Sequence, residues 1–261
     1  TIKQKVHVLT KKIPGKNWIQ RFLKHHPVIK LGRPSGLDPK RTQCFNKQTV
    51  EDHFELLRKI MEEHRIPWEN VYNMDEKGCQ RGGGRGHSRA KYLMSRGQRV
   101  HYKFKSDNLE LVTIIECVCA DGTALQPAFV FSGVHHCPSW WNVDPAINTY
   151  TTPNGWTDDY VGTDWFETSF IPQASARNNS DKPLLLIFDG HSSHLTDKIR
   201  DLAIQHNIHL FCLPPHTTHK LQPLDVGCFG PLQNAWRKRC DDVVIETGAE
   251  IPRKDFVSEY M

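Results

Sequence analysis

The amino-acid sequence predicts a mixed α/β domain that follows a short, basic helical segment. Strand-like runs come first, between residues 70 and 131, and helix-like and strand-like segments then alternate to about residue 245. A chain with this order folds as helices layered on a mixed sheet. Of its 261 residues 38% are hydrophobic, which is enough to bury a core without disulfides or structural metals.

The first predicted element is a helix at residues 14–27 (PGKNWIQRFLKHHP), which Pro14 begins and Pro27 ends. Trp18 and Phe22 are four residues apart and form one apolar stripe, with basic side chains beside it. A short helix of this kind suits a helix-turn-helix that reads DNA. An ordinary docking helix would fit the same pattern nearly as well.

Two basic blocks favour a polyanionic partner, with DNA the first candidate. Residues 1–44 contain eleven Lys or Arg and one acidic residue, and residues 81–105 contain eight Lys or Arg and no acidic residue. A solvated surface or a basic linker at residues 30–47 would give the same composition. Around Gly82–Gly84 we expect a hairpin tip that contacts backbone phosphates without reading bases. The candidate DNA-binding residues are Lys16, Arg21, Lys24, Arg33, Arg81, Arg85 and Arg89.

The larger domain begins after a helix predicted at residues 48–65, where apolar residues recur at helical spacing. Asp121-Gly122 predicts the turn of a β-hairpin. Residues 132–156 have no clear period and give no prediction. The remaining predicted elements are strands at 70–75, 109–120 and 124–131, a helix at 158–170, a strand at 183–188, a helix at 195–206, a strand at 208–213 and a helix from 225 to about 245.

Three aspartates are predicted to lie near the carboxyl ends of strands, where open α/β sheets bind their ligands. Asp75 ends the first predicted strand, Asp189 follows the strand at 183–188, and Asp225 begins the last long helix. Two carboxylates about 4 Å apart repel by about 4 kcal/mol at an effective dielectric near 20, so such a cluster needs a cation. Oxygen ligands suit Mg²⁺ or Mn²⁺, and two such ions can cleave a phosphodiester. Each aspartate by itself could instead cap a helix or form a turn.

Several segments resemble the catalytic blocks of the pogo-like branch of the mariner transposase superfamily. They are NMDEKG (73–78), ECVCADGTALQPAFVFSG (116–133), NGWTDDYVGTDWF (154–166), IFDGHSSH (187–194) and LPPHTTHKLQPLDVGCFGPLQ (213–233). The 35 residues between Asp189 and Asp225 are close to the spacing of that branch. The resemblance implies a ribonuclease-H-like, retroviral-integrase-like fold and a DDE-type endonuclease. It also implies that Asp75, Asp189 and Asp225 are catalytic and hold Mg²⁺ or Mn²⁺, as two ions.

The N-terminal helix is similar to the end of the helix-turn-helix found in centromere protein B and pogo-like transposases. We therefore expect residues 1–44 to be a partial helix-turn-helix with a basic linker, 45–69 a connecting helix and 70–261 the catalytic domain. The chain lacks an initiator Met and ends on KDFVSEYM, which reads as mid-helix, so we expect a fragment truncated at both ends.

The expected function is metal-dependent cutting of double-stranded DNA at transposon ends, followed by transfer of the 3′-hydroxyl end to target DNA. The family implies a homodimer, and a DNA substrate implies the nucleus rather than a membrane or a small-molecule substrate. The longest apolar run is five residues, far below the roughly 20 that cross a membrane. One alternative is a domesticated, non-catalytic DNA-binding protein of the centromere-protein-B type. Another is a zinc protein built on His135-His136-Cys137.

Two histidines directly after Asp189 complete the candidate site. His191 and His194 could contact a phosphate or assist proton transfer, or they could orient the loop and cap the next helix. Glu76 should point to the opposite face of the sheet from Asp75 and is left out of the site.

Overall fold

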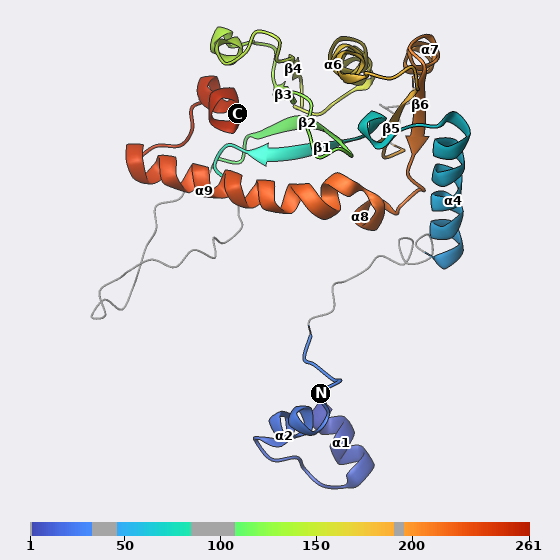
Figure 1. Cartoon of the computed structure of the whole chain (residues 1–261). Helices are drawn as coiled ribbons and strands as arrows, with labels where there is room; N and C mark the ends of the chain where they lie inside the picture. The colour runs from blue at the N-terminus through green and yellow to red at the C-terminus, as the bar shows by residue number, and fades with distance from the viewer. Residues whose placement is uncertain (1, 33–45, 85–107, 191–195) are drawn as a thin grey trace. The chain divides into compact units, whose positions relative to one another are not determined.

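The computed structural model describes residues 2–32, 46–84, 108–190 and 196–261. The chain forms two compact units, Thr1–Asp38 and Pro39–Met261 (Figure 1). The division of the chain into a partial helix-turn-helix, a connecting helix and a catalytic domain stays a prediction.

The N-terminal unit contains two helices, α1 (Ile2–Thr10) and α2 (Trp18–His25). The helix predicted at residues 14–27 is confirmed as α2 with a later start, because the amide of Trp18 first closes a turn on the carbonyl of Gly15. The rings of Trp18 and Phe22 stack at 5.0 Å, as the spacing indicated. Neither described helix buries a residue, so each exposes its apolar stripe at least in part.

The larger unit is built on a six-stranded sheet in the order β4-β3-β2-β1-β5-β6. β1 pairs antiparallel with β2 and parallel with β5, and the pair β2–β3 is antiparallel. The pairs β3–β4 and β5–β6 are parallel. The strands are β1 (Val71–Gln80), β2 (Leu111–Cys119), β3 (Ala128–Ser132), β4 (Thr149–Thr152), β5 (Leu184–Phe188) and β6 (Ile208–Cys212). The mixed α/β prediction is confirmed.

The predicted hairpin is present, with shorter strands than the sequence suggested. Gly122 adopts a φ of +91°, a conformation that glycine favours, and the carboxylate of Asp121 accepts a hydrogen bond from the amide of Thr123. Beyond the turn only Val118 and Ala124 form a bridge, so β3 begins at Ala128 rather than at residue 124.

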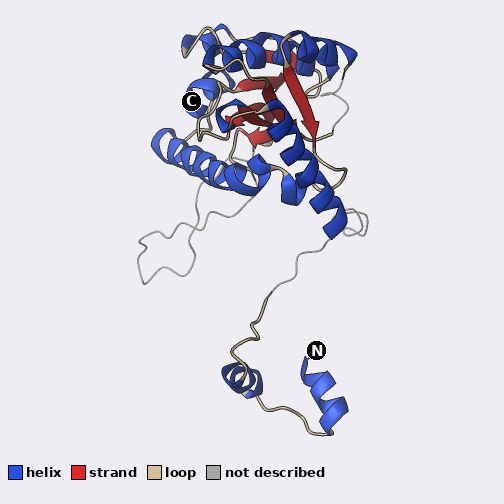
Figure 2. Ribbon diagram, turned by 45° about the vertical axis from the view of Figure 1, so that its right-hand side comes forward, coloured by secondary structure: helices blue, strands red, loops and turns tan. Residues whose placement is uncertain are grey.

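Helices cover both faces of this sheet (Figure 2). The helices of this unit are α4 (Lys47–His64), α5 (Asp159–Trp165), α6 (Ile171–Arg177), α7 (Asp197–Gln205), α8 (Thr218–Leu221), α9 (Phe229–Thr247) and α10 (Phe256–Tyr260). Short 3₁₀ turns are η1 (Trp68–Asn70), η2 (Pro138–Asn142) and η6 (Arg253–Asp255), and π-helical segments are η3 (Phe166–Phe170) and η5 (Leu224–Cys228).

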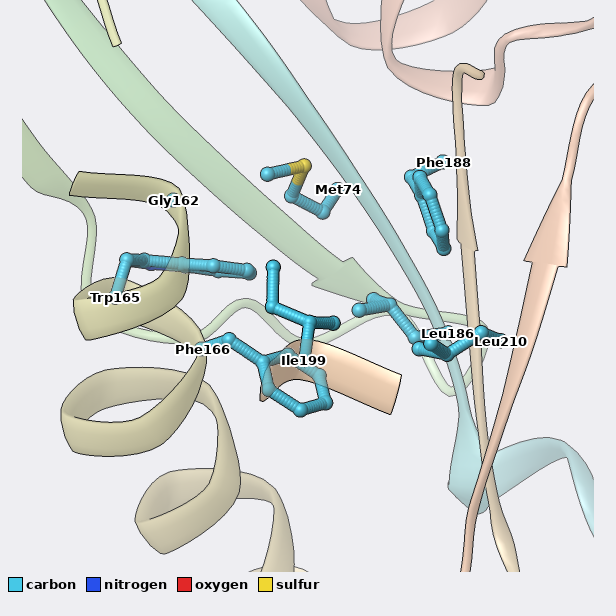
Figure 3. Close-up of a pocket in the computed structure, with 8 residues that line it drawn as sticks. All are labelled: Met74, Gly162, Trp165, Phe166, Leu186, Phe188, Ile199 and Leu210. Carbon is cyan, nitrogen blue, oxygen red and sulfur yellow. The ribbon is translucent and has the colours of Figure 1, made fainter. Parts of the chain in front are cut away.

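Alternation along β1 assigns its side chains to two different cores. Tyr72 and Met74 pack with residues of α5, α6 and α7 on one face. Cys79 packs with α9 on the other face, and Val71 on that face packs against α4. The first of these cores contains a small apolar cavity of about 10 Å³. Met74, Trp165 and Phe188 are among the side chains that line it (Figure 3). This face carries apolar contacts, and the opposite face of β1 is the one that carries Asp75.

Several helices and strands begin or end at residues other than those predicted. The helix predicted at 158–170 continues as α5, η3 and α6 to Arg177. β4 lies in the segment 132–156, where the sequence has no clear hydrophobic period and no element was predicted. The long helix predicted from residue 225 is preceded by the π-helical η5, so its regular part, α9, begins at Phe229.

Candidate active site

Asp75 lies in the middle of β1, and the prediction that it ends a strand is wrong. β1 continues to Gln80 because it pairs with β2 over its whole length, and Asp75 stands opposite Glu116 in that register. The parallel pairing with β5 stops at Asn73 and Ile187. Asp75 therefore lies just beyond the point where β1 and β5 separate, which still places it at the carboxyl end of the parallel part of the sheet.

Asp189 follows the last residue of β5 and is partly buried. Strand β5 is buried along its whole length, as its run of apolar residues predicted. Because β5 runs parallel to β1, Asp189 leaves the sheet at the same edge as Asp75. The two aspartates predicted at the ends of neighbouring strands therefore do share one edge.

Asp225 belongs to η5 and is exposed. The residues just before it contact β1: the side-chain amide of Gln222 donates to the carbonyl of Met74 at 3.0 Å. The first position of α9 is preceded by Cys228 and that of η5 by Pro223, so Asp225 is the N-cap of neither. The alternative that Asp225 simply caps a helix is therefore wrong.

The negative charges of Asp189 and Asp225 act on the carboxyl group of Asp75. The pKa of Asp75 is raised to about 7, first by burial and further by the negative charges of Asp225 and Asp189. A backbone hydrogen bond from the amide of Glu76 to the carboxylate of Asp75, at 2.9 Å, lowers that pKa in part. Three carboxylates from three segments thus act on one another at one edge of the sheet.

The donor set fits a divalent cation by its chemistry. All three side chains offer carboxylate oxygens, which Mg²⁺ and Mn²⁺ prefer, and a cation would relieve the repulsion that raises the pKa of Asp75. Among the described residues, however, no three His, Cys, Asp or Glu side chains lie close enough to hold an ion. The acids are electrostatically coupled but not drawn together into a ligand arrangement.

A cavity of about 350 Å³ opens beside Asp189. Its wall comes largely from the segment between β6 and α8, with Pro214, Pro215 and His216, and from His219 of α8. The two histidines were not among the predicted site residues, although the string LPPHTTHK shows that they lie between the second and third acids.

Glu116 is a second residue that sequence reasoning missed. It stands opposite Asp75 in the register of β1 and β2, and its carboxylate accepts a hydrogen bond from the hydroxyl of Tyr260. Burial raises the pKa of Glu116. Only the pairing of β1 with β2 could have indicated its position. Glu76 continues the alternation of β1 and lies on the face of Met74, as expected.

Arg81 is not available for DNA, and its prediction as a phosphate contact is wrong. Only 12% of its side chain is exposed, and its guanidinium pairs with the carboxylates of Glu110 and, at 2.8 Å, Glu250. It also donates to the carbonyl of Ile251. Arg81 therefore joins the end of β1 to the start of β2 and to the C-terminal segment.

The other predicted contacts are only partly described. Lys16, Arg21 and Lys24 lie on or beside α2 with exposed side chains. Arg33, Arg85, Arg89, His191 and His194 lie outside the described residues.

Within the described residues, the segment His135-His136-Cys137 is not part of a three-ligand metal site. The ring of His136 stacks on Trp141 and its Nε2 atom lies 3.3 Å from the hydroxyl of Thr151. No third ligand from the described part of the chain completes a metal site there.

The sequence is similar to two proteins with different names. Over 197 residues the chain is 34% identical to the MFS-type transporter clz9 of Cochliobolus lunatus, covering 74% of this chain and 21% of that protein. Over 126 residues it is 26% identical to the human pogo transposable element with KRAB domain, covering 48% of this chain and 20% of that protein. The chain thus spans about a fifth of the length of these relatives. Within its described helices, none has the length and apolar character required to cross a membrane.

The fold has a clear counterpart among solved structures. The Mos1 mariner paired-end complex with Mn aligns over 100% of this chain and 70% of the other, with a TM-score of 0.59 and 12% identity. At that identity the likeness establishes the fold alone, and the predicted ribonuclease-H-like architecture is confirmed.

The family itself follows from the sequence match. Residues 108–256 match the DDE superfamily endonuclease family, a stretch that contains Asp189 and Asp225 and more than half of the chain. Together with the pogo relative, this match confirms the predicted resemblance to pogo- and mariner-type transposases. The chain therefore belongs to the DDE superfamily endonucleases.

Proposed function

We propose that this chain is the catalytic part of a metal-dependent transposase that cuts DNA at transposon ends and joins the 3′-hydroxyl end to target DNA. The observation that carries the proposal is that Asp75 and Asp189 share one edge of the sheet, with Asp225 near enough for its charge to act on Asp75. Burial first, and then the charges of Asp225 and Asp189, raise the pKa of Asp75. Membership of the DDE superfamily endonucleases supports a nuclease.

Asp75, Asp189 and Asp225 are the residues that would hold Mg²⁺ or Mn²⁺, as two ions. When bound, such ions activate a water or a 3′-hydroxyl and stabilise the leaving oxygen of a phosphodiester. Because the pKa of Asp75 is about 7, Asp75 is protonated in a fraction of the protein molecules at neutral pH. Cation binding would then release that proton and would strengthen as the pH rises.

The walls of the site suit an extended polyanion. The cavity beside Asp189 is lined by His216 and His219, and an imidazole N–H can donate a hydrogen bond to a phosphate oxygen. We infer that this cavity receives the strand next to the scissile phosphate. Exposed Lys16, Arg21 and Lys24 would add contacts that strengthen DNA binding without base specificity.

The partners and the compartment follow from the same reading. The Mos1 neighbour was solved as a paired-end complex, which supports double-stranded DNA as the partner and a homodimer as the acting species. A protein that acts on chromosomal DNA works in the nucleus. Both statements are part of the proposal.

A nicking assay on supercoiled plasmid DNA with Mn²⁺ or Mg²⁺ tests the activity. We expect wild type to nick and Asp189→Asn to lose about 100-fold or more of the rate, since the substitution removes a ligand but keeps the shape. Asp197→Asn is the matched control, because the side chain of Asp197 is 97% exposed at the start of α7. Equal nicking by wild type and Asp189→Asn would contradict the proposal.

The second candidate is a domesticated DNA-binding protein that keeps the fold without the chemistry. It is favoured by one observation, that the described acids do not form a closed metal-ligand group. Calorimetric titration with Mn²⁺ separates the two functions. Uptake that Asp189→Asn abolishes supports the nuclease, and DNA binding without any Mn²⁺ uptake supports the domesticated protein.

A further inference from the structure

A buried pair of amide side chains connects the three segments that carry the acids. Asn73 is 5% exposed and Gln222 is fully buried. The side-chain amide of Asn73 donates to the side-chain oxygen of Gln222 at 2.6 Å. Neither residue was predicted to be part of the site.

Asn73 contacts all three segments with one short side chain. It lies two residues before Asp75 on β1, and its amide also donates to the carbonyl of Ile187 at 3.0 Å. Ile187 lies two residues before Asp189. The side-chain oxygen of Asn73 accepts the backbone amide of Leu224 at 3.1 Å, one residue before Asp225.

Gln222 closes the network on the other side of β1. Its oxygen accepts from Asn73, and its amide donates at 3.0 Å to the carbonyl of Met74, the residue next to Asp75. The bonds among Asn73, Gln222 and the backbone join neutral groups. A hydrogen bond between the side chain of Gln222 and the carboxyl of Asp75 lowers the pKa of that carboxyl in part. In a buried site such a network holds its members in one geometry, because each lost bond leaves a polar group without a partner.

We propose that Asn73 and Gln222 are positioning residues that hold the segments of Asp75, Asp189 and Asp225 in register for cation binding. The inference rests on the proposed function for its consequence, the binding of metal. The positioning itself is independent of metal and is tested without it. Groups that orient metal ligands by hydrogen bonds commonly change metal affinity by about 10- to 100-fold when removed.

Asn70 provides a matched control. It is 2% exposed, directly before β1, and its side-chain amide donates to the carbonyls of Lys182 and Pro183 at 3.2 and 3.1 Å. It also bonds Asn178 and Ser180. Asn70 thus ties β1 to β5 at the opposite end of these strands from the acids. Asn70→Ala removes a buried amide of the same kind at the end of β1 and β5 that is remote from Asp75 and Asp189, and within the described residues the side chain of Asn70 has no hydrogen bond to the segment of Asp225.

The first experiment measures amide hydrogen exchange in the metal-free protein. In Asn73→Ala we expect the amides of Leu224 and of Val226, which bonds the carbonyl of Gln222, to exchange about tenfold faster or more. In Asn70→Ala these amides should exchange at the wild-type rate. Gln222→Met keeps the volume of the side chain and serves if Asn73→Ala does not fold.

The second experiment measures Mn²⁺ affinity by calorimetry. Asn73→Ala and Gln222→Met should each bind Mn²⁺ about tenfold more weakly or worse, and Asn70→Ala should bind as wild type does. The double variant Asn73→Ala/Gln222→Met should be no worse than the weaker single variant, since both changes break one network. A general loss of stability would not produce this pattern.

The results that overturn the inference are distinct from failure of the proposed function. If Asn73→Ala and Asn70→Ala show the same exchange at Leu224, or the same Mn²⁺ affinity, the positioning role is wrong. If wild type takes up no Mn²⁺, the proposed function fails, and hydrogen exchange still decides whether Asn73 holds the acid-bearing segments.

Discussion

Asp75 and Asp189 each lie two residues beyond a register pair, Asn73 and Ile187, at which the parallel strands β1 and β5 last face each other. The sheet therefore places both carboxylates at the same level, just beyond the point where the strands separate. Asp225 reaches this level from η5, through the contacts of Gln222 and Leu224 with β1. Burial and the negative charges of Asp225 and Asp189 raise the pKa of Asp75 at this level.

The metal-free protein should lose stability as the pH rises. The pKa of Asp75 is about 7 in the folded state against 3.8 as its ordinary value, so the folded state binds more protons between these values. The stability associated with protonated Asp75 is complete below pH 4 and is lost as the pH passes 7. We expect Asp75→Asn to be more stable than wild type by about 2 kcal/mol at pH 8, a value reduced for partial solvent access.

Urea unfolding at pH 4 and pH 8 in the presence of a chelator checks this prediction. The two proteins should have similar free energies of unfolding at pH 4 and differ at pH 8. Asp197→Asn, which changes an exposed acid, should track wild type at both values. A wild-type protein as stable as Asp75→Asn at pH 8 would contradict it.

Manganese should stabilise the wild-type protein at pH 8. A ligand at 100 times its Kd adds about 2.7 kcal/mol to the free energy of unfolding. Thermal unfolding with and without Mn²⁺ should show an increase in Tm for wild type and Asp197→Asn, and none for Asp189→Asn. An equal increase in all three proteins would place the cation elsewhere.

Much of this site could be predicted from the sequence, because its acids follow recognisable elements. The apolar run before Asp189 identifies β5, and the block LQPLDVG identifies Asp225. The extent of β1 could not be predicted, since polar residues such as Glu76 and Lys77 lie within the strand and only pairing with β2 makes them extended. Asn73 reads as an ordinary strand residue, and its role depends on contacts with residues more than 110 positions away.

Arg81 illustrates the opposite error. A basic residue beside three glycines was predicted to contact phosphate, and composition alone gives no sign of its partners, Glu110 and Glu250. The N-terminal α1 was missed for a related reason. Its segment IKQKVHVLT contains β-branched residues and no start or stop signal that distinguishes it from a basic linker.

Arg81→Met should destabilise the protein by about 2 kcal/mol, because Glu250 and Glu110 stay partly buried after losing a cation. Plasmid binding should be unchanged. Lys238→Met is the matched control, since the pair of Lys238 with Asp242 is exposed and worth less than about 1 kcal/mol. Denaturant unfolding and a filter-binding assay measure the two effects. Weaker DNA binding by Arg81→Met without loss of stability would contradict this prediction and would show that Arg81 contacts DNA.

The basic side chains of the N-terminal unit should account for part of the salt dependence of DNA binding. Replacing Lys16, Arg21 and Lys24 together by Ala should lower the slope of log K against log salt by about 2 to 3, if each contacts one phosphate. The matched control is the triple variant of exposed Lys59, Arg200 and Lys238. An equal change of slope in both triple variants would show that net charge rather than position is responsible.

The central claim is that three aspartates from distant parts of the chain share divalent cations. Anomalous diffraction at the manganese edge, on crystals of the protein soaked in Mn²⁺, tests it most directly. The account predicts anomalous peaks bounded by the carboxylates of Asp75, Asp189 and Asp225, absent in Asp189→Asn. Peaks at other residues, or carboxylates that remain apart with no peak between them, would contradict it.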